Sequence, residues 1–300
     1  MAQGNVTVLD DRGILAVSGP DRRAFLQGLV SNDVEKVAPD RAAYAALLTA
    51  QGKYLHDFLM AAAGEAIWLD AEAERLADLK RRLSMYRLRA KLSLDELPDL
   101  AVAAVFGENA CAALGLPEQA GAARSFGEGV ALVDPRLAAL GARAILPRGE
   151  IREALAGAGL AETDIAAYDR HRLALGVPDG SRDLVIEKSI LLESGFDELN
   201  GVDWQKGCYI GQELTARTKY RGLIKKRLFP VTIDGSPPPS GALVTLDGKE
   251  AGEMRSSRGR FGLALLRLDA VAEHRALSAE GATLSPLRPE WMQLETSDEP

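Results

Sequence analysis

The stretch of this 300-residue chain that decides its fold reads Lys206-Gly207-Cys208-Tyr209-Ile210-Gly211-Gln212-Glu213-Leu214-Thr215-Ala216-Arg217. Its two glycines lie four residues apart and flank a cysteine and a tyrosine. Glycine permits backbone geometry that other residues resist and lets another group approach closely, so the pattern predicts a tight turn. Residues 210–217 can continue as a helix, with a glutamate and an arginine spaced i, i+4 on one face.

Cys208 would lie just before the N-terminus of that helix and two residues from Lys206. A helix N-terminus and a nearby ammonium group both favour the thiolate form of a cysteine, so Cys208 is a candidate reactive residue. The alternative is a structural turn in which Cys208 is a small buried hydrophobe. The sequence leaves both interpretations open.

The twelve-residue stretch resembles the signature of the YgfZ/GcvT-like folate-binding family, whose members are relatives of the glycine-cleavage T-protein and act in iron–sulfur protein maturation. The resemblance covers most of the chain, and further matching segments are Phe25-Leu26-Gln27-Gly28, Ser31-Asn32-Asp33, Ala46-Leu47-Leu48, Gln51-Gly52-Lys53, Tyr86-Arg87-Leu88-Arg89, Gly176-Val177-Pro178 and Tyr220-Arg221-Gly222. The segments at residues 86–89 and 225–230 look most similar to the mitochondrial iron–sulfur assembly branch and its bacterial counterparts.

This resemblance implies an α+β fold of the GcvT-like, aminomethyltransferase type. It also implies that tetrahydrofolate, or a one-carbon derivative of it, binds near the centre of the molecule. The implied role is the maturation or repair of 4Fe–4S proteins, which in bacteria supports an iron–sulfur-dependent tRNA modification. The expected partners are therefore folate and iron–sulfur assembly or client proteins.

T-proteins hold a pair of aspartates in the strand that follows a glycine turn, and the matching position here reads His56-Asp57. Asp57 remains as a catalytic candidate, because a lone carboxylate can still hydrogen-bond a protonated nitrogen or the pterin edge. The alternative is that Asp57 is an outward-facing strand residue. Loss of the second acid puts aminomethyl transfer in doubt, so whether the chain is an enzyme stays open. A tetrahydrofolate-dependent aminomethyltransferase or demethylase is the alternative function.

The resemblance also places Glu193 where T-proteins hold the pterin ring with a glutamate. A carboxylate suits this role because it can accept two hydrogen bonds from neighbouring N–H groups. The alternative is that Glu193 caps the following turn, since acidic residues are common near helix starts.

Three basic residues of the signature region complete the expected folate site. Arg217 and Arg221 can grip the anionic glutamate tail of folate, and Lys206 belongs to the same cofactor-binding set. Tyr209 can stack on the flat ring system, unless it shares a helix face with its apolar neighbours and belongs to the core.

The pattern of apolar residues predicts a hairpin from segments 6–9 and 13–17, a meander from segments 43–48, 54–60 and 66–69, and a helix over 71–86. After residue 221 the texture changes to short strands at 228–233, 242–246, 250–255 and 262–266, which suggests a small barrel. We therefore expect residues 1–224 to form the folate-binding GcvT-like region, as two intertwined α+β subdomains, and residues 225–300 to form the β-barrel.

The net charge is −7, from 36 basic and 43 acidic residues, but it is unevenly distributed. Residues 80–91 carry six basic side chains and no acidic one, and residues 204–228 carry seven basic side chains against one acidic. Such basic islands suggest an anionic ligand, or simply solvated faces. An RNA-binding accessory protein is a further hypothesis. The acidic total and the aromatic content of 5% weigh against nucleic acid as a partner.

Only Cys111 and Cys208 are present, which excludes a disulfide framework and a four-thiolate site within one chain. The three histidines lack metal-ligand spacing, so we expect no metal site. No secretory signal and no membrane-spanning run is visible, so the expected protein is a cytoplasmic monomer.

Overall fold

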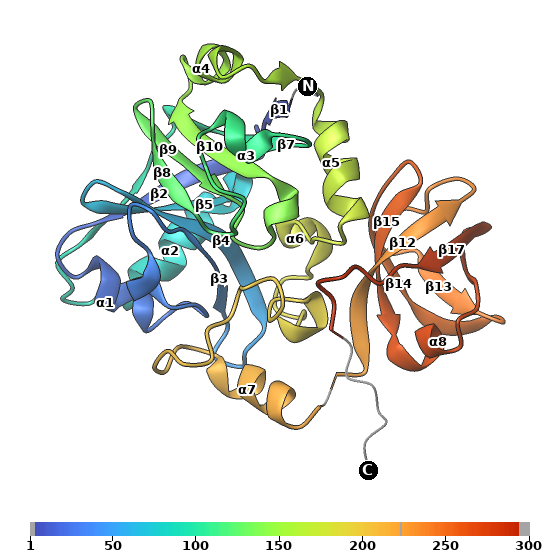
Figure 1. Ribbon diagram of the computed structural model, residues 1–300. Helices are drawn as coiled ribbons and strands as arrows, with labels where there is room; N and C mark the ends of the chain where they lie inside the picture. Colours follow the sequence, from blue (N-terminus) through green and yellow to red (C-terminus); the bar gives the residue numbers. More distant parts are fainter. Residues whose placement is uncertain (1–3, 223, 294–300) are drawn as a thin grey trace.

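The computed structural model describes residues 4–222 and 224–293 and contains two open sheets and a closed barrel (Figure 1). The two sheets lie together in one half of the molecule, and the barrel forms the other half. This α+β architecture with a C-terminal six-stranded barrel confirms the fold class expected from the sequence.

The first sheet has five antiparallel strands in the order β3-β4-β5-β2-β6. Their bounds are β2 (Arg12–Ser18), β3 (Ala43–Leu48), β4 (Tyr54–Ala63), β5 (Ala66–Glu72) and β6 (Ser93–Glu96). The predicted meander is confirmed as β3, β4 and β5. The helix predicted over 71–86 is shorter: β5 continues to Glu72, a 3₁₀ turn η2 (Ala73–Arg75) follows, and α2 runs over Leu76–Tyr86.

Two helices cover one face of this sheet. They are α1 (Arg22–Gln27) and α2, and their apolar side chains enter the same buried cluster as residues from β2, β4 and β5. In α2 the buried positions are Leu76, Leu79 and Leu83, at spacings of three and four residues, which place them on one side of a helix.

The second sheet has six strands in the order β11-β1-β7-β10-β9-β8. Their bounds are β1 (Asn5–Val8), β7 (Leu100–Phe106), β8 (Ala123–Phe126), β9 (Gly129–Val133), β10 (Ala142–Pro147) and β11 (Ala161–Glu162). The short helices α3 (Ala110–Ala113) and α4 (Ile151–Gly157) pack with it, and a shared core cluster joins it to β3 and β4 of the first sheet.

The predicted hairpin of segments 6–9 and 13–17 is wrong. β1 pairs with β7 and β11 in the second sheet, whereas β2 pairs with β5 and β6 in the first. Leu9 donates its backbone N–H to the Val102 carbonyl at 2.8 Å, so the chain leaves one sheet and enters the other within a few residues. Strand periodicity reveals a strand but not its partner, which here is distant in the sequence.

The barrel closes in the order β12-β15-β14-β13-β16-β17. Its elements are β12 (Lys226–Asp234), β13 (Leu243–Leu246), β14 (Lys249–Arg258), β15 (Phe261–Arg267), α8 (Leu268–Ala272), β16 (Leu277–Ala279) and β17 (Ala282–Pro286). The four predicted strands correspond to β12–β15. Apolar side chains fill the barrel interior as one cluster.

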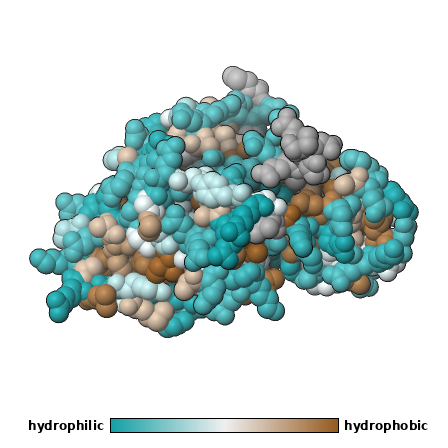
Figure 2. Space-filling view, turned by 90° about the horizontal axis from the view of Figure 1, so that it is seen from below, coloured by the Kyte–Doolittle hydropathy of each residue, from teal (hydrophilic) through white to brown (hydrophobic). Residues whose placement is uncertain are grey.

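The chain between the sheets and the barrel is mostly irregular. It contains α5 (Ile165–Ala174), α6 (Gly180–Asp183), η4 (Leu192–Ser194) and α7 (Gln212–Tyr220). α5 lies between the second sheet and the barrel (Figure 1). Among the described residues, no helix is long and apolar enough to cross a membrane. Seen from below, hydrophobic groups reach the surface on the half of the molecule that carries α1 and α2 (Figure 2).

Candidate functional site

The signature turn packs directly against the turn between β3 and β4. Gly211 caps α7 with a φ of +80°, and a Cβ added there would lie 2.4 Å from the Thr49 carbonyl oxygen. Gly52 faces it with a φ of +76°, and a Cβ there would lie 2.7 Å from the Gly211 carbonyl oxygen. A side chain at either position would clash with the other turn, so this packing of the two turns requires glycine at both positions. The predicted i, i+4 pair is present, with Arg217 Nη2 and Glu213 Oε1 at 2.6 Å.

Lys206 is buried and anchors the turn to the end of α1. Its Nζ donates to the carbonyl oxygens of Gln27, Val30 and Asn32 at 2.8, 2.6 and 2.8 Å. Burial lowers its pKa to about 8. An ammonium group has three donors, and all three serve backbone carbonyls here. Lys206, which the resemblance predicts to bind folate, thus holds the backbone of residues 27–32 in this structure.

Cys208 is exposed, whereas Cys111 on α3 is buried. The interpretation of Cys208 as a buried hydrophobe is therefore wrong. Neither feature that is expected to activate the thiol is in place. The Lys206 ammonium is held by backbone carbonyls, and α7 begins only at Gln212. Exposure of the Cys208 side chain is the feature that still favours reactivity.

Tyr209 belongs to the central core, as the alternative interpretation held. Its side chain is buried with Tyr44 and Tyr54 in one cluster, and the Lys206 Nζ lies 5.2 Å from its ring centroid. Burial raises its pKa to about 12. The hydroxyl of buried Thr215 lies beside it and opposes this shift. This burial leaves the Tyr209 ring no open face on which a ligand could stack.

Asp57 is buried on β4 rather than facing outward. Its two carboxylate oxygens accept hydrogen bonds from the Tyr44 and Tyr54 hydroxyls at 2.8 and 2.7 Å. Burial raises the pKa of Asp57, and the nearby Arg12 opposes that shift. Both oxygens are thus already engaged by tyrosines.

His56, the neighbouring residue, faces the helical side of the sheet. Its Nε2 lies 2.9 Å from Asp78 Oδ2 on α2, and burial lowers its pKa to about 4, aided by Arg75. Successive strand residues point to opposite faces, so His56 and Asp57 cannot act together on one ligand. The pairing of two acids at this position in T-proteins has no counterpart here.

Glu193 lies in η4 and is half-buried. Its pKa is raised by burial, while Lys53 from the β3–β4 turn and Lys226 from β12 act to lower it. Within residues 4–222 and 224–293, its carboxylate makes no hydrogen bond or ion pair. Glu193 is thus an available acceptor at the junction of the first sheet, η4 and the barrel.

Arg217 and Arg221 lie at the exposed side of α7. Arg217 pairs with Glu213, and the Arg221 side chain has no partner among the residues that the structure describes. The predicted site residues therefore separate. Tyr209 and Asp57 enter the core, Glu193 lies at the junction, Cys208 and Lys206 lie near α1, and the arginines face solvent.

A buried ionic network beside α5 was missed by the sequence analysis. Arg172 Nε and Nη1 bond Asp169 Oδ1 and Asp183 Oδ2 at 2.7 and 2.8 Å, and its Nη2 reaches Ser256 Oγ on β14 at 3.1 Å. An adjoining cavity of about 10 Å³ is far too small for folate. The available signal was the density of oppositely charged side chains in residues 169–183, because such side chains can pair with one another where the chain buries them.

Residues 225–294 match the family described as the CAF17 C-terminal beta-barrel domain. The chain is 36% identical over 306 residues to the human mitochondrial iron-sulfur cluster assembly factor IBA57, covering 94% of this chain and 84% of the human protein. The mouse protein of that name is also 36% identical, with coverage of 88% and 77%.

Among solved structures, the glycine cleavage system aminomethyltransferase T from Bartonella henselae superposes with a TM-score of 0.80. It shares 18% identity, and the match covers 97% of this chain and 87% of that one. At this identity the likeness shows the fold alone, which is GcvT-like. With identity and coverage of this extent to its human relative, the chain belongs to the IBA57/CAF17 family of YgfZ-like iron–sulfur cluster assembly factors.

Proposed function

We propose that this chain acts in the maturation or repair of 4Fe–4S proteins and does so with a reduced folate bound beside Glu193. The observation that supports folate binding is the half-buried Glu193 carboxylate, which has no hydrogen-bond or ion-pair partner among the described residues and interacts electrostatically with Lys53 and Lys226. Lys226 also pairs with Glu250 at 3.8 Å on the barrel. A carboxylate accepts hydrogen bonds from the N–H groups of a pterin edge, and ammonium groups attract an anionic glutamate tail. These are the complementary charges that a folate presents.

Only some of the residues that the resemblance assigned to folate are available to bind it. In this proposal Glu193, Lys53 and Lys226 bind and orient the folate, and the exposed Arg221 at the end of α7, which has no ion-pair partner among the described residues, is a further candidate for its anionic tail. Asp57 and Lys206 are engaged by tyrosines and by backbone carbonyls. A bound tetrahydrofolate would supply one-carbon chemistry, and the protein's own part is to hold the ring and the tail.

The exposed Cys208 is the group that we assign to the iron–sulfur side of this function, because it is the accessible one of the two thiols. Support of an iron–sulfur-dependent tRNA modification would follow indirectly, through delivery of a complete cluster to the modifying enzyme. Aminomethyl transfer is disfavoured, because His56 points to α2 and both Asp57 oxygens already accept hydrogen bonds.

The deciding experiment is calorimetric titration of the purified chain with tetrahydrofolate. Glu193→Ala should weaken binding about tenfold to a hundredfold, since a charge-assisted hydrogen-bond pair contributes about 1.5–3 kcal/mol. Glu213→Ala, which removes an exposed carboxylate on α7, is the matched control and should bind as the parent does. Equal affinity of the Glu193 variant and the parent would remove Glu193 from the site.

A further inference from the structure

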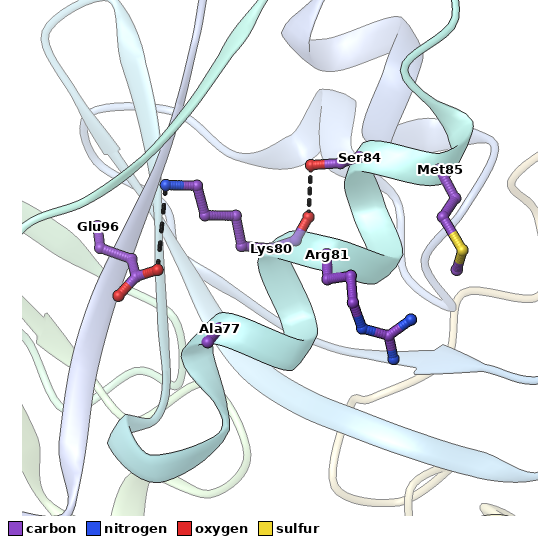
Figure 3. A pocket seen from close by; sticks show the side chains of 6 residues that line it. All are labelled: Ala77, Lys80, Arg81, Ser84, Met85 and Glu96. Atoms are coloured by element: carbon purple, nitrogen blue, oxygen red, sulfur yellow. Dashed lines mark hydrogen bonds and ion pairs between the residues drawn. The ribbon is translucent and has the colours of Figure 1, made fainter.

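A shallow, open groove runs along α2 beside β6. Its volume is about 610 Å³, and it is lined by Ala77, Lys80, Arg81, Ser84, Met85 and Glu96. In Figure 3, Lys80 extends toward Glu96, which its Nζ approaches to 4.0 Å, while Arg81 and Met85 extend away from that pair. The groove therefore presents both basic and apolar groups to solvent.

The turn that follows α2 continues this surface. Met85 is 56% exposed, Tyr86 43% and Leu88 90%, so three large apolar side chains face solvent within four residues. Leu88 also has a φ of +41°, a left-handed conformation that L-residues other than glycine, asparagine and aspartate resist. The turn is closed by the Ala90 N–H, which donates to the Arg87 carbonyl at 2.8 Å. Leu88 buries little of its side chain and adopts an unfavourable backbone conformation, so a contribution to folding stability does not account for a leucine at this position.

Cations surround this apolar group. Lys80 and Arg81 are partly satisfied by Glu96 and Asp78, but the side chains of Arg87, Arg89 and Lys91 make no ion pair in the part of the chain that the structure describes. Residues 80–91 contain no acidic residue, although the whole chain carries a charge of −7. The Asp21 carboxylate also reaches this turn, where it accepts from the Lys91 backbone N–H at 2.7 Å, but the three cations outnumber it and leave the turn with a net positive charge.

We propose that this α2 surface, the groove together with residues 85–91, docks an acidic segment of a protein partner. The segment's carboxylates pair with Arg87, Arg89 and Lys91, and an apolar side chain of the segment packs against Met85 and Leu88. Charge complementarity steers such an encounter, and the apolar anchor fixes it. This inference rests on the α2 surface alone and holds whether or not folate binds.

The same observations argue against two other classes of ligand. RNA-binding surfaces stack bases on aromatic rings, and this surface offers aliphatic side chains with Tyr86 as its one ring. An anionic membrane would cover the whole α2 surface, including the carboxylates of Glu96 and Asp78 beside Lys80 and Arg81, whereas a narrow segment can contact residues 85–91 alone. A polypeptide segment with acidic and apolar side chains fits this mixture of cations and exposed apolar groups.

Site-specific cross-linking in cells tests the partner's chemistry. The photoreactive residue p-benzoylphenylalanine replaces Leu88 in the full chain, and Leu243 on β13, which is 53% exposed, is replaced as the matched control. The expected result is an adduct at position 88 to a peptide rich in Asp and Glu that contains an apolar residue. The same adduct should be absent at position 243 and lost with Arg87→Glu/Arg89→Glu. An adduct to RNA, lipid or a basic peptide, or no specific adduct, would overturn the proposal.

A binding assay with the purified chain provides the second readout. The probe is a fluorescent pool of twelve-residue peptides with four Asp or Glu around a central Leu or Phe, compared with the same pool carrying Lys in place of the acids. We expect anisotropy binding of the acidic pool that weakens with salt and falls about tenfold in the Arg87→Glu/Arg89→Glu variant. Leu88→Gly should weaken it while preserving the melting temperature, because glycine accepts the positive φ. Equal binding of the two pools, or of parent and variants, would contradict the proposal, and tetrahydrofolate calorimetry should be unchanged in all of these variants.

Discussion

The two thiols of this chain occupy opposite surroundings, and their reactivity should differ accordingly. Burial and the nearby Glu118 raise the pKa of Cys111, while Cys208 is exposed. We expect Cys208 to react with iodoacetamide at neutral pH at least about tenfold faster than Cys111, because alkylation needs an accessible thiolate. Mass spectrometry of the native protein over time measures both rates, and equal rates would contradict the assignment.

Cys208→Ser should keep the parent's unfolding free energy within about 0.5 kcal/mol and lose activity in a cell-based assay of 4Fe–4S enzymes.

Gly207 and Gly211 flank the same turn, but they should contribute differently to stability. An alanine at Gly211 would combine a φ of +80° with a Cβ 2.4 Å from the Thr49 carbonyl oxygen, whereas a Cβ at Gly207 meets no atom within 4 Å. Gly211→Ala should therefore lower the free energy of unfolding by about 1–3 kcal/mol, and Gly207→Ala should change it by less than about 0.5 kcal/mol. Urea unfolding of both variants decides this, and a large loss at Gly207 would be the unexpected result.

Strand β4 and helix α2 are joined by a titratable contact between His56 and Asp78. Burial lowers the pKa of His56 from its ordinary value of 6.5 to about 4. Between these values the unfolded chain takes up a proton that the folded chain does not. The free energy of unfolding should therefore fall as the pH falls from 6.5 to 4, by at most about 3 kcal/mol from this residue.

His56→Gln keeps a side-chain N–H for Asp78 but does not titrate, so its stability should decline less over this pH range. Substitution of the exposed His274 by Gln should leave the parent's decline intact. Urea titrations at several pH values measure the difference between the variants. Identical pH profiles for the His56 variant and the parent would show that the β4–α2 contact does not titrate as described.

Elements and their partners differ in how far the sequence could predict them. The meander β3–β4–β5 and strands β12–β15 were predictable because alternation and turn residues are local signals. The hairpin prediction failed because β1 pairs with β7, nearly a hundred residues away. The local alternation of apolar residues does not indicate which distant strand will be the partner. For the same reason Lys206 was assigned to folate. Its partners, the carbonyls of residues 27, 30 and 32, meet it only after the chain has folded.

At the level of the molecule, Arg172 holds the α5 region, α6 and the barrel together. It bonds buried Asp169 and Asp183, and Asp183 in turn accepts from the backbone N–H of Ser256 at 3.1 Å on β14. Arg172→Met should therefore lower the free energy of unfolding by about 3–5 kcal/mol, because it leaves the buried Asp183 carboxylate without its ion-pair partner, while Asp169 keeps Arg182 at 3.0 Å.

Arg258→Met is the matched control, since this half-exposed arginine also contacts Asp169, at 3.2 Å, but is screened by water. Its loss should be below about 1 kcal/mol in the same urea experiment. Lys226 belongs to the barrel and Glu193 to η4, so loosening this junction should also weaken tetrahydrofolate binding in Arg172→Met and not in Arg258→Met. Equal losses in the two variants would mean that the junction rests on apolar packing instead, and that the buried ionic network only satisfies charges already placed there.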